Sequence, residues 1–222
     1  MIDLLQESIK ELKLHNAKKR ERHIEKLLDY YNGNDAGNYI RRMFSSAIFN
    51  EIPLVETNIT RKFINKMSRI YTIGANRNVN NKYDELTVLK SARMKHVERM
   101  TRLCGTIATR VVWNEGETPY FDYRPIYFFH VFFDDDPFVP SAITYPMMQP
   151  VRDTSKVGEM QYAYWDKEKY VHMDENGAIL NEIPHEYGTL PFVFTHRENQ
   201  PDDFYVEGAN DLINANEHIN IA

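Results

Sequence analysis

Cysteine is almost absent from the sequence, since Cys104 is the only one among 222 residues. A single cysteine excludes an intrachain disulfide and any metal site built from cysteine thiolates. The N-terminus lacks the basic start, apolar stretch and small-residue cleavage site of a secretory signal. We therefore expect synthesis in the cytosol, where thiols stay reduced.

Motifs of nucleotide and hydrolytic chemistry are also missing. The nine glycines are scattered, and none forms the GxGxxG or GxxxxGKS/T loop that cradles phosphates. There is no GxSxG nucleophile turn, no HExxH zinc helix and no metal-ligand spacing among the histidines. No apolar run is long enough to span a bilayer. We therefore expect a protein that is not an enzyme, with no catalytic residues, no metal and no cofactor.

The charges that are present divide unevenly along the chain. Residues 1–111 hold 21 Lys and Arg against 12 Asp and Glu, a net of +9. Residues 112–222 hold 6 against 20, a net of −14. Such polarity indicates either that the halves face different partners, or each other in an assembly, or that both are solvated surfaces.

The first half of the sequence has the periodicity of helices. Apolar residues recur at three- and four-residue steps over residues 2–31, although residues 15–22 are polar and predict an exposed or broken centre. Gly33 supplies a stop signal. A second helix is predicted over residues 58–74 and a third over residues 84–103. The apolar face expected for the second helix comprises Ile59, Phe63, Ile64, Met67, Ile70 and Tyr71.

From Thr106 onward the pattern becomes that of short strands and tight turns, which indicates an antiparallel meander. The aromatic run 126–133 is interpreted as one strand buried on both faces, and core is favoured over base stacking for it. A helix is predicted from Val206, with Leu212, Ile213, Ile219 and Ile221 as its apolar residues. The other predicted strands are 107–113, 120–125, 160–165, 169–173, 178–183 and 190–196.

These elements predict an α+β fold, in which N-terminal amphipathic helices precede an antiparallel β-meander and a C-terminal helix. The expected division is a helical part over 1–105, a β part over 106–205 and the start of a helix over 206–222. The last helix shows no capping signal. We therefore expect the chain to stop inside an element, although a frayed terminal helix is the alternative.

One carboxylate cluster stands out, because Asp134, Asp135 and Asp136 follow the aromatic run directly. Oxygen ligands at a strand end could bind Mg²⁺, as in nucleases, if Glu115 or Glu159 joined them. Adjacent residues point in alternating directions, however, and Pro137 favours a turn. An acidic loop is therefore the preferred interpretation.

Basic residues concentrate in the predicted helices of the first half. They could contact phosphate or an acidic neighbouring subunit, whereas a solvated helix face is the alternative for any single one. The candidate contact residues are Arg41, Arg42, Arg61, Lys62, Lys66 and Arg69.

Three blocks of sequence resemble the portal proteins of tailed bacteriophages. RHIEKLLDYYNGN (22–34) resembles a helix with a YYxG-type ending, and NITRKFINKMSRIYTIG (58–74) resembles the next portal helix. LPFVFTHREN (190–199) and DFYVEGANDLINANEHINI (203–221) are similar to a later strand, acidic loop and helix of that family. The blocks follow the family's order, whereas residues 106–189 match only in general character.

The resemblance implies the peripheral wing of a portal subunit and the start of its stem. It implies a homo-oligomeric ring, typically a dodecamer, at one capsid vertex. That ring would nucleate head assembly, receive the terminase motor, pass double-stranded DNA and later join the tail. The implied partners are the major capsid protein, the scaffold, the terminase and a tail adaptor, with no membrane. The expected location is the virion, after assembly in the host cytoplasm.

Two other functions are compatible with the residues. One is a metal-dependent nuclease that uses the Asp134–Asp136 cluster. The other is a phage head-completion or adaptor protein that is complete at this length.

Overall fold

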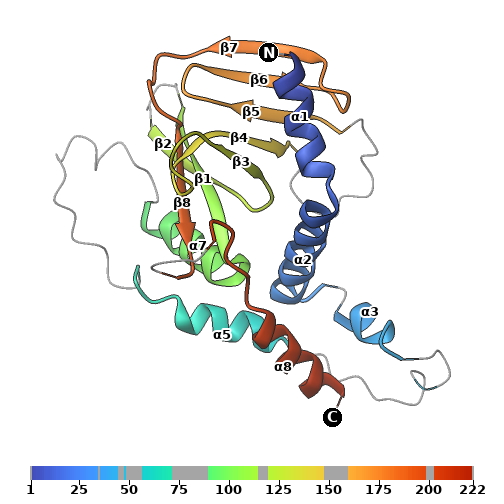
Figure 1. The fold of residues 1–222 in the computed structure, drawn as a ribbon. Helices are drawn as coiled ribbons and strands as arrows, with labels where there is room; N and C mark the ends of the chain where they lie inside the picture. The colour runs from blue at the N-terminus through green and yellow to red at the C-terminus, as the bar shows by residue number, and fades with distance from the viewer. Residues whose placement is uncertain are drawn as a thin grey trace.

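The computed structural model describes residues 2–34, 36–44, 48, 57–71, 90–114, 120–147, 160–198 and 203–221. The fold is α+β, as predicted, with helices followed by antiparallel sheets and a further helix (Figure 1). The helices are α1 (Ile2–Lys13), α2 (His15–Asn32), α3 (Ala36–Arg41), α5 (Ile59–Met67), α7 (Lys90–Cys104) and α8 (Asn210–Ile221). The strands are β1 (Thr106–Asn114), β2 (Tyr120–Ile126), β3 (His130–Phe133), β4 (Pro140–Pro146), β5 (Tyr162–Trp165), β6 (Lys169–Met173), β7 (Ile179–Pro184) and β8 (Phe192–His196).

The strands form two antiparallel sheets. The larger sheet has the order β3-β4-β5-β6-β7, so consecutive strands are neighbours, as in a meander. The predicted strands 160–165, 169–173 and 178–183 correspond to β5, β6 and β7, whereas β4 was not predicted. The smaller sheet has the order β2-β1-β8. The predicted pairing of β1 with β2 is confirmed, with Val111 opposite Tyr123. β8 returns from far along the chain to pair with the other edge of β1, where Thr106 lies opposite His196.

The prediction of one strand over residues 126–133 is wrong. β2 ends at Ile126 and belongs to the small sheet, whereas β3 begins at His130 and belongs to the large one. Phe128 and Phe129 lie in the irregular link, and each is 1% exposed. Phe128 packs in one buried cluster and Phe129 in a second cluster. The aromatic run is therefore core, as preferred, but it supplies two cores rather than two faces of one strand.

The helical boundaries differ from the prediction at several points. The first helix divides at Leu14, whose φ of −61° and ψ of 154° are extended, while residues 15–22 are helical. The stop at Gly33 is confirmed, with φ of 80°. α5 ends at Met67, and the predicted stop at Gly74 lies outside the described residues, as does the predicted start of α7 over 84–89.

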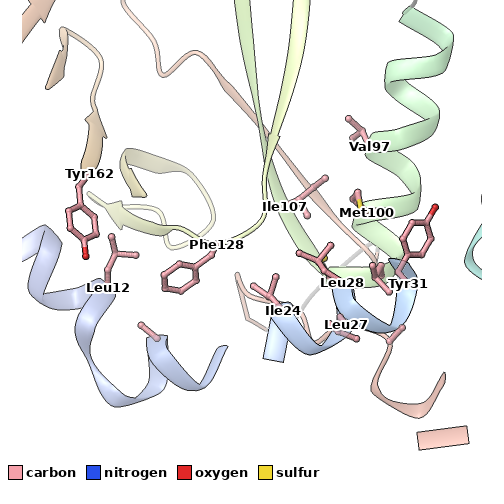
Figure 2. Packing of buried hydrophobic residues seen from close by; sticks show 14 of the residues in the cluster. Leu12, Ile24, Leu27, Leu28, Tyr31, Val97, Met100, Ile107, Phe128 and Tyr162 are labelled. Atoms are coloured by element: carbon pink, nitrogen blue, oxygen red, sulfur yellow. The ribbon is translucent and has the colours of Figure 1, made fainter. Parts of the chain in front are cut away.

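The larger core lies where the helices meet both sheets. Figure 2 shows it from Leu12 and Tyr162 at one end to Ile107 and Met100 at the other. Leu27 is also fully buried there. Each large apolar side chain buried in this way contributes about 1.5–3 kcal/mol. This packing places α2 beside α7 and fixes the end of α2, where the candidate site begins.

The connection into α8 explains why that helix starts at Asn210 and not at Val206. Gly105 has a φ of +87°, and a Cβ there would collide with the carbonyl oxygen of Val206. The N–H of Ala209 donates to the carbonyl oxygen of Leu103 at 2.8 Å. The segment before Asn210 is therefore held along the α7–β1 junction, and its backbone hydrogen bonds are committed there. Among the described helices, none is long and apolar enough to cross a membrane.

Candidate functional site

The candidate site begins where α5 starts against the end of α2. Asn58 caps α5, because its side-chain oxygen accepts a hydrogen bond from the N–H of Arg61 at 2.9 Å. The amide nitrogen of the same side chain donates to the carbonyl oxygen of Tyr31 at 3.1 Å. Tyr31 also donates its hydroxyl to Asn65 at 3.0 Å. One cap residue thus starts α5 and ties it to α2.

α8 completes the junction with polar side chains. Asn216 accepts a hydrogen bond from the N–H of Ile59 at 3.3 Å, and Asn220 accepts one from the N–H of Thr57 at 3.1 Å. Both asparagines are buried. The first N–H groups of a helix lack partners within the helix, and Asn216 supplies an acceptor for that of Ile59, the first residue of α5. Asn220 holds the segment just before the cap.

Glu217 carries the one buried carboxylate among the described residues of this junction. It is 5% exposed, lies 2.7 Å from the Nζ of Lys26 and accepts a hydrogen bond from the Tyr30 hydroxyl at 2.8 Å. Burial, and next the hydrogen bond and charge of Glu217, raise the pKa of Tyr30. Tyr30 therefore stays protonated and acts as a donor. Three helices are thus joined by a polar network rather than by apolar packing alone.

The sequence missed this network. Ile213, Asn216, Glu217 and Asn220 form the buried stripe of α8, whereas Ile219, predicted to lie on the apolar face, is half exposed. The stripe has the i, i+3, i+4, i+7 spacing of one helix face, but only its first member is apolar. This spacing would have predicted the buried stripe if asparagine and glutamate had been accepted as buried residues on a helix face.

The six predicted contact residues all lie at the end of the molecule formed by α3, α5 and α8 (Figure 1). Arg41 is the last residue of α3 and Arg42 follows it; three of the other four lie on α5, and Arg69 lies just after it. All six are exposed. Because α3 and α5 both contact α8, the fold brings the two groups to the same end. The six are Arg41, Arg42, Arg61, Lys62, Lys66 and Arg69.

At this end of the molecule the segments around α3 and α5 are strongly positive, whereas α8 carries Asp211 and Glu217. Residues 36–44 and 57–71 contain those six cations and no acidic residue. The Arg42 guanidinium lies 5.6 Å from the Tyr39 ring, and that of Arg61 lies 5.8 Å from the Tyr31 ring. The Nε of Arg69 donates to the carbonyl oxygen of Lys66 at 2.8 Å. These contacts orient the arginine side chains without neutralising their charge.

The predicted apolar face of α5 is mostly not buried. Phe63, Met67 and Ile70 are 53%, 51% and 66% exposed, whereas the buried side is Thr60, Ile64 and Ser68. The structure turns the more polar side of α5 inward, since the small Thr60 and Ser68 allow close packing there. An apolar stripe is therefore left on the surface beside the cations. We call Lys62, Phe63, Lys66, Met67, Arg69 and Ile70 the basic surface.

The carboxylate cluster forms an exposed turn. Asp136 accepts a hydrogen bond from the N–H of Phe138 at 2.8 Å, and Asp134 lies 3.8 Å from Lys167. Asp135 is exposed between them. In the described part of the chain no group of three acidic, histidine or cysteine side chains gathers as a metal site would require. Glu115 and Glu159 lie outside the described residues.

A cleft of about 570 Å³ opens beside α2, away from the basic surface. It is lined by Lys19 and His23 and also by Asp203 and Glu207, so both signs of charge meet in it. Arg20 donates to the carbonyl oxygen of Phe129 at 2.6 Å, and its guanidinium lies 3.7 Å from the Tyr205 ring. Arg20 thereby holds the loop before α8 against α2. With this mixture the cleft favours neither anions nor cations.

Comparison of the chain with protein-family models and with curated proteins found no match.

Proposed function

We propose that this chain forms the wing and the start of the stem of a bacteriophage portal subunit, which forms a ring for DNA passage. The observation that carries the proposal is the junction of α2, α5 and α8. The blocks 22–34, 58–74 and 203–221, which carry the resemblance, are far apart in the chain. They nevertheless meet, through Asn58 with Tyr31, Asn216 with Ile59, and Glu217 with Lys26. The three blocks thus form one structural unit, as adjoining parts of a portal wing and stem would.

In this proposal the ring sits at one capsid vertex of the virion, assembled in the host cytoplasm. It forms the DNA entry and exit channel and the platform for the terminase motor and, later, the tail. The terminase supplies the energy for packaging, so the portal subunit itself needs no phosphate-binding loop of the kind that this sequence lacks. The head-assembly partners are the major capsid protein and the scaffold.

The charge distribution supports a ring of identical subunits. A heterologous interface joins two different surfaces of neighbouring copies, and it closes into a ring when the rotation between copies permits. The positive end at α3 and α5 and the acidic β-rich half supply two such surfaces. Charged groups across the interface would then set the register between copies.

Light scattering of the full gene product across salt concentration tests this reading. Between about 0.05 M and 0.5 M salt, screening shortens the range of surface charges from roughly 14 Å to 4 Å. We expect a closed oligomer at low salt and a smaller oligomeric fraction at high salt. Assembly that does not respond to salt would count against a charge-guided ring.

A nuclease assay tests the competing enzymatic function. Incubation with double-stranded DNA and Mg²⁺ is expected to leave the DNA intact, because Asp134, Asp135 and Asp136 lie along an exposed turn, in which Asp136 accepts a hydrogen bond from the N–H of Phe138. Cleavage that Asp135→Ala abolishes would establish the nuclease instead.

A further inference from the structure

The basic surface has a counterpart at the other end of the molecule. β7 is the last strand of the large sheet, and every one of its residues is exposed. Ile179, Leu180 and Ile183 are 42%, 53% and 48% exposed. Surface leucines and isoleucines on their own need no explanation, but three lie on one six-residue edge strand. Ile179 lies opposite Met173 and Ile183 opposite Tyr170, so their side chains lie on opposite faces of the sheet. The three residues therefore form an apolar strip that is exposed on both faces of the edge.

Acidic residues surround this strip. Glu168, Glu175 and Glu186 are exposed in the turns that flank β6 and β7, and Glu182 lies on β7 itself. Glu182 already has a partner, since Lys169 lies 2.8 Å away. We call Ile179, Leu180, Ile183, Glu168, Glu175, Glu182 and Glu186 the acidic edge.

The two surfaces match in chemistry and cannot meet within one molecule. Each has three exposed apolar side chains; three cations border those of the basic surface, and four carboxylates those of the acidic edge. Figure 1 shows β7 at one end of the structure and α5 at the other. A contact between them therefore requires two copies.

We propose that the basic surface of one copy packs against the acidic edge of a second copy of this chain. The inference rests on the proposed ring, which it deepens by naming the two surfaces that join. Each copy uses one of each surface, so the contact is heterologous and satisfies both surfaces on every subunit of a closed ring. The exposed stripe Phe63, Met67 and Ile70 would supply the apolar centre, and the charges would form the rim.

Cysteine pairing tests the contact directly. Cys104 is buried, and burial raises the pKa of its thiol to about 12, so it does not compete. We expect mixed full gene products, one carrying Met67→Cys and the other Ile183→Cys, to form a disulfide-linked dimer under mild oxidation. Each variant alone should stay unlinked. A 67–67 or 183–183 disulfide would show a different, self-complementary contact and overturn the proposal.

Charge exchange provides a second, independent readout. The double change Lys62→Glu with Lys66→Glu should weaken self-association about tenfold, as close interfacial charge pairs do. Adding Glu168→Lys with Glu186→Lys should restore much of it. A matched control is Arg124→Glu, which changes the charge of an exposed residue outside both surfaces and should leave association unchanged. Failure of the reciprocal change to rescue would overturn the pairing.

The outcomes separate this inference from the function on which it rests. Rings that form while positions 67 and 183 stay unlinked overturn the interface and leave the ring standing. A gene product that stays monomeric overturns both. If Lys62→Glu with Lys66→Glu weakens binding of a DNA duplex but not self-association, DNA rather than a second copy occupies the basic surface, and the proposal fails.

Discussion

Glu217 is the residue on which the junction of α2, α5 and α8 depends most. A buried ion pair gives little net stability, because removing both charges from water opposes their attraction. Removing only one partner is different, since it leaves the other without compensation. Glu217 satisfies both Lys26 and Tyr30, so its loss affects two groups at once.

We predict that Glu217→Ala lowers the free energy of unfolding by about 1–3 kcal/mol, measured by urea denaturation. The lower part of the range applies because the Lys26 side chain is 27% exposed, so water still solvates its charge when Glu217 is removed. Tyr30→Phe should cost about 1 kcal/mol, and the double variant should cost less than the sum of the two. Glu186→Ala, at an exposed position, is the control. If the two changes in the free energy of unfolding add up in the double variant, Tyr30 and Glu217 do not act in one network.

His130 makes the stability depend on pH. Burial, and next the positive charge of Arg20, lower its pKa to about 4, against about 6.5 in an unfolded chain. Between these values the folded state binds fewer protons than the unfolded state, so the free energy of unfolding falls as pH falls from 6.5 to 4. His130 is only partly buried, so solvent screening keeps its contribution well below the roughly 3 kcal/mol that the full shift would carry. Burial lowers the pKa of His23, His96 and His196 in the same direction.

We predict that His130→Gln reduces this loss of stability between pH 7 and pH 4, measured by thermal unfolding at several pH values. The variant still titrates through the other three histidines, so some pH dependence should remain. An unchanged pH profile would show that His130 is not held neutral in the folded protein.

At the scale of elements, the joint at Gly105 positions α8. It links α7 to β1 and receives the segment before α8, so any side chain there would push Val206 away. Gly188 offers a matched control, because it also has a positive φ, of +64°, but nothing lies within 4 Å of a Cβ there. Comparing substitutions at the two positions separates the cost of backbone strain, which both share, from the cost of steric collision, which arises only at Gly105.

We predict that Gly105→Ala destabilises the protein by more than about 2 kcal/mol, whereas Gly188→Ala costs about 1 kcal/mol. In the first variant the amides of α8 should also exchange faster with deuterium, because the docking of residues 206–209 is disturbed. Equal losses of stability at the two positions would show that the collision with Val206 has no effect of its own.

Local periodicity predicted most elements because strands and helices differ in the spacing of their apolar residues. It predicted the pairing of β1 with β2 and the succession of β5, β6 and β7 in the large sheet, but it predicted no strand at β4. It failed over 126–133 because a strongly apolar run looks continuous, whereas Phe128 and Phe129 enter different cores. No local signal marks the point where a chain leaves one sheet for another.

The candidate site was predicted in part. Charge clustering identified all six cations from Arg41 to Arg69, because the excess of positive over negative residues in the first half is visible in the sequence. Apolar periodicity, in contrast, placed Phe63 and Met67 on the face expected to be buried, because it assumes that the more apolar face of a helix points inward. The buried polar stripe of α8 was missed for the same reason.

At the scale of the whole molecule, the central claim is that identical subunits assemble into a ring around a channel. The structure supplies two complementary surfaces at opposite ends and a polar junction that holds α8 in a fixed position between α3 and α5. A rigid subunit with two distinct surfaces repeats one contact from copy to copy, and that contact closes into a ring when the rotation between copies permits.

Negative-stain microscopy of the full gene product at low salt tests this claim most directly. The account predicts rings of uniform diameter with a central channel and one rotational symmetry. Isolated single particles, or two-fold symmetric dimers without a channel, would contradict it.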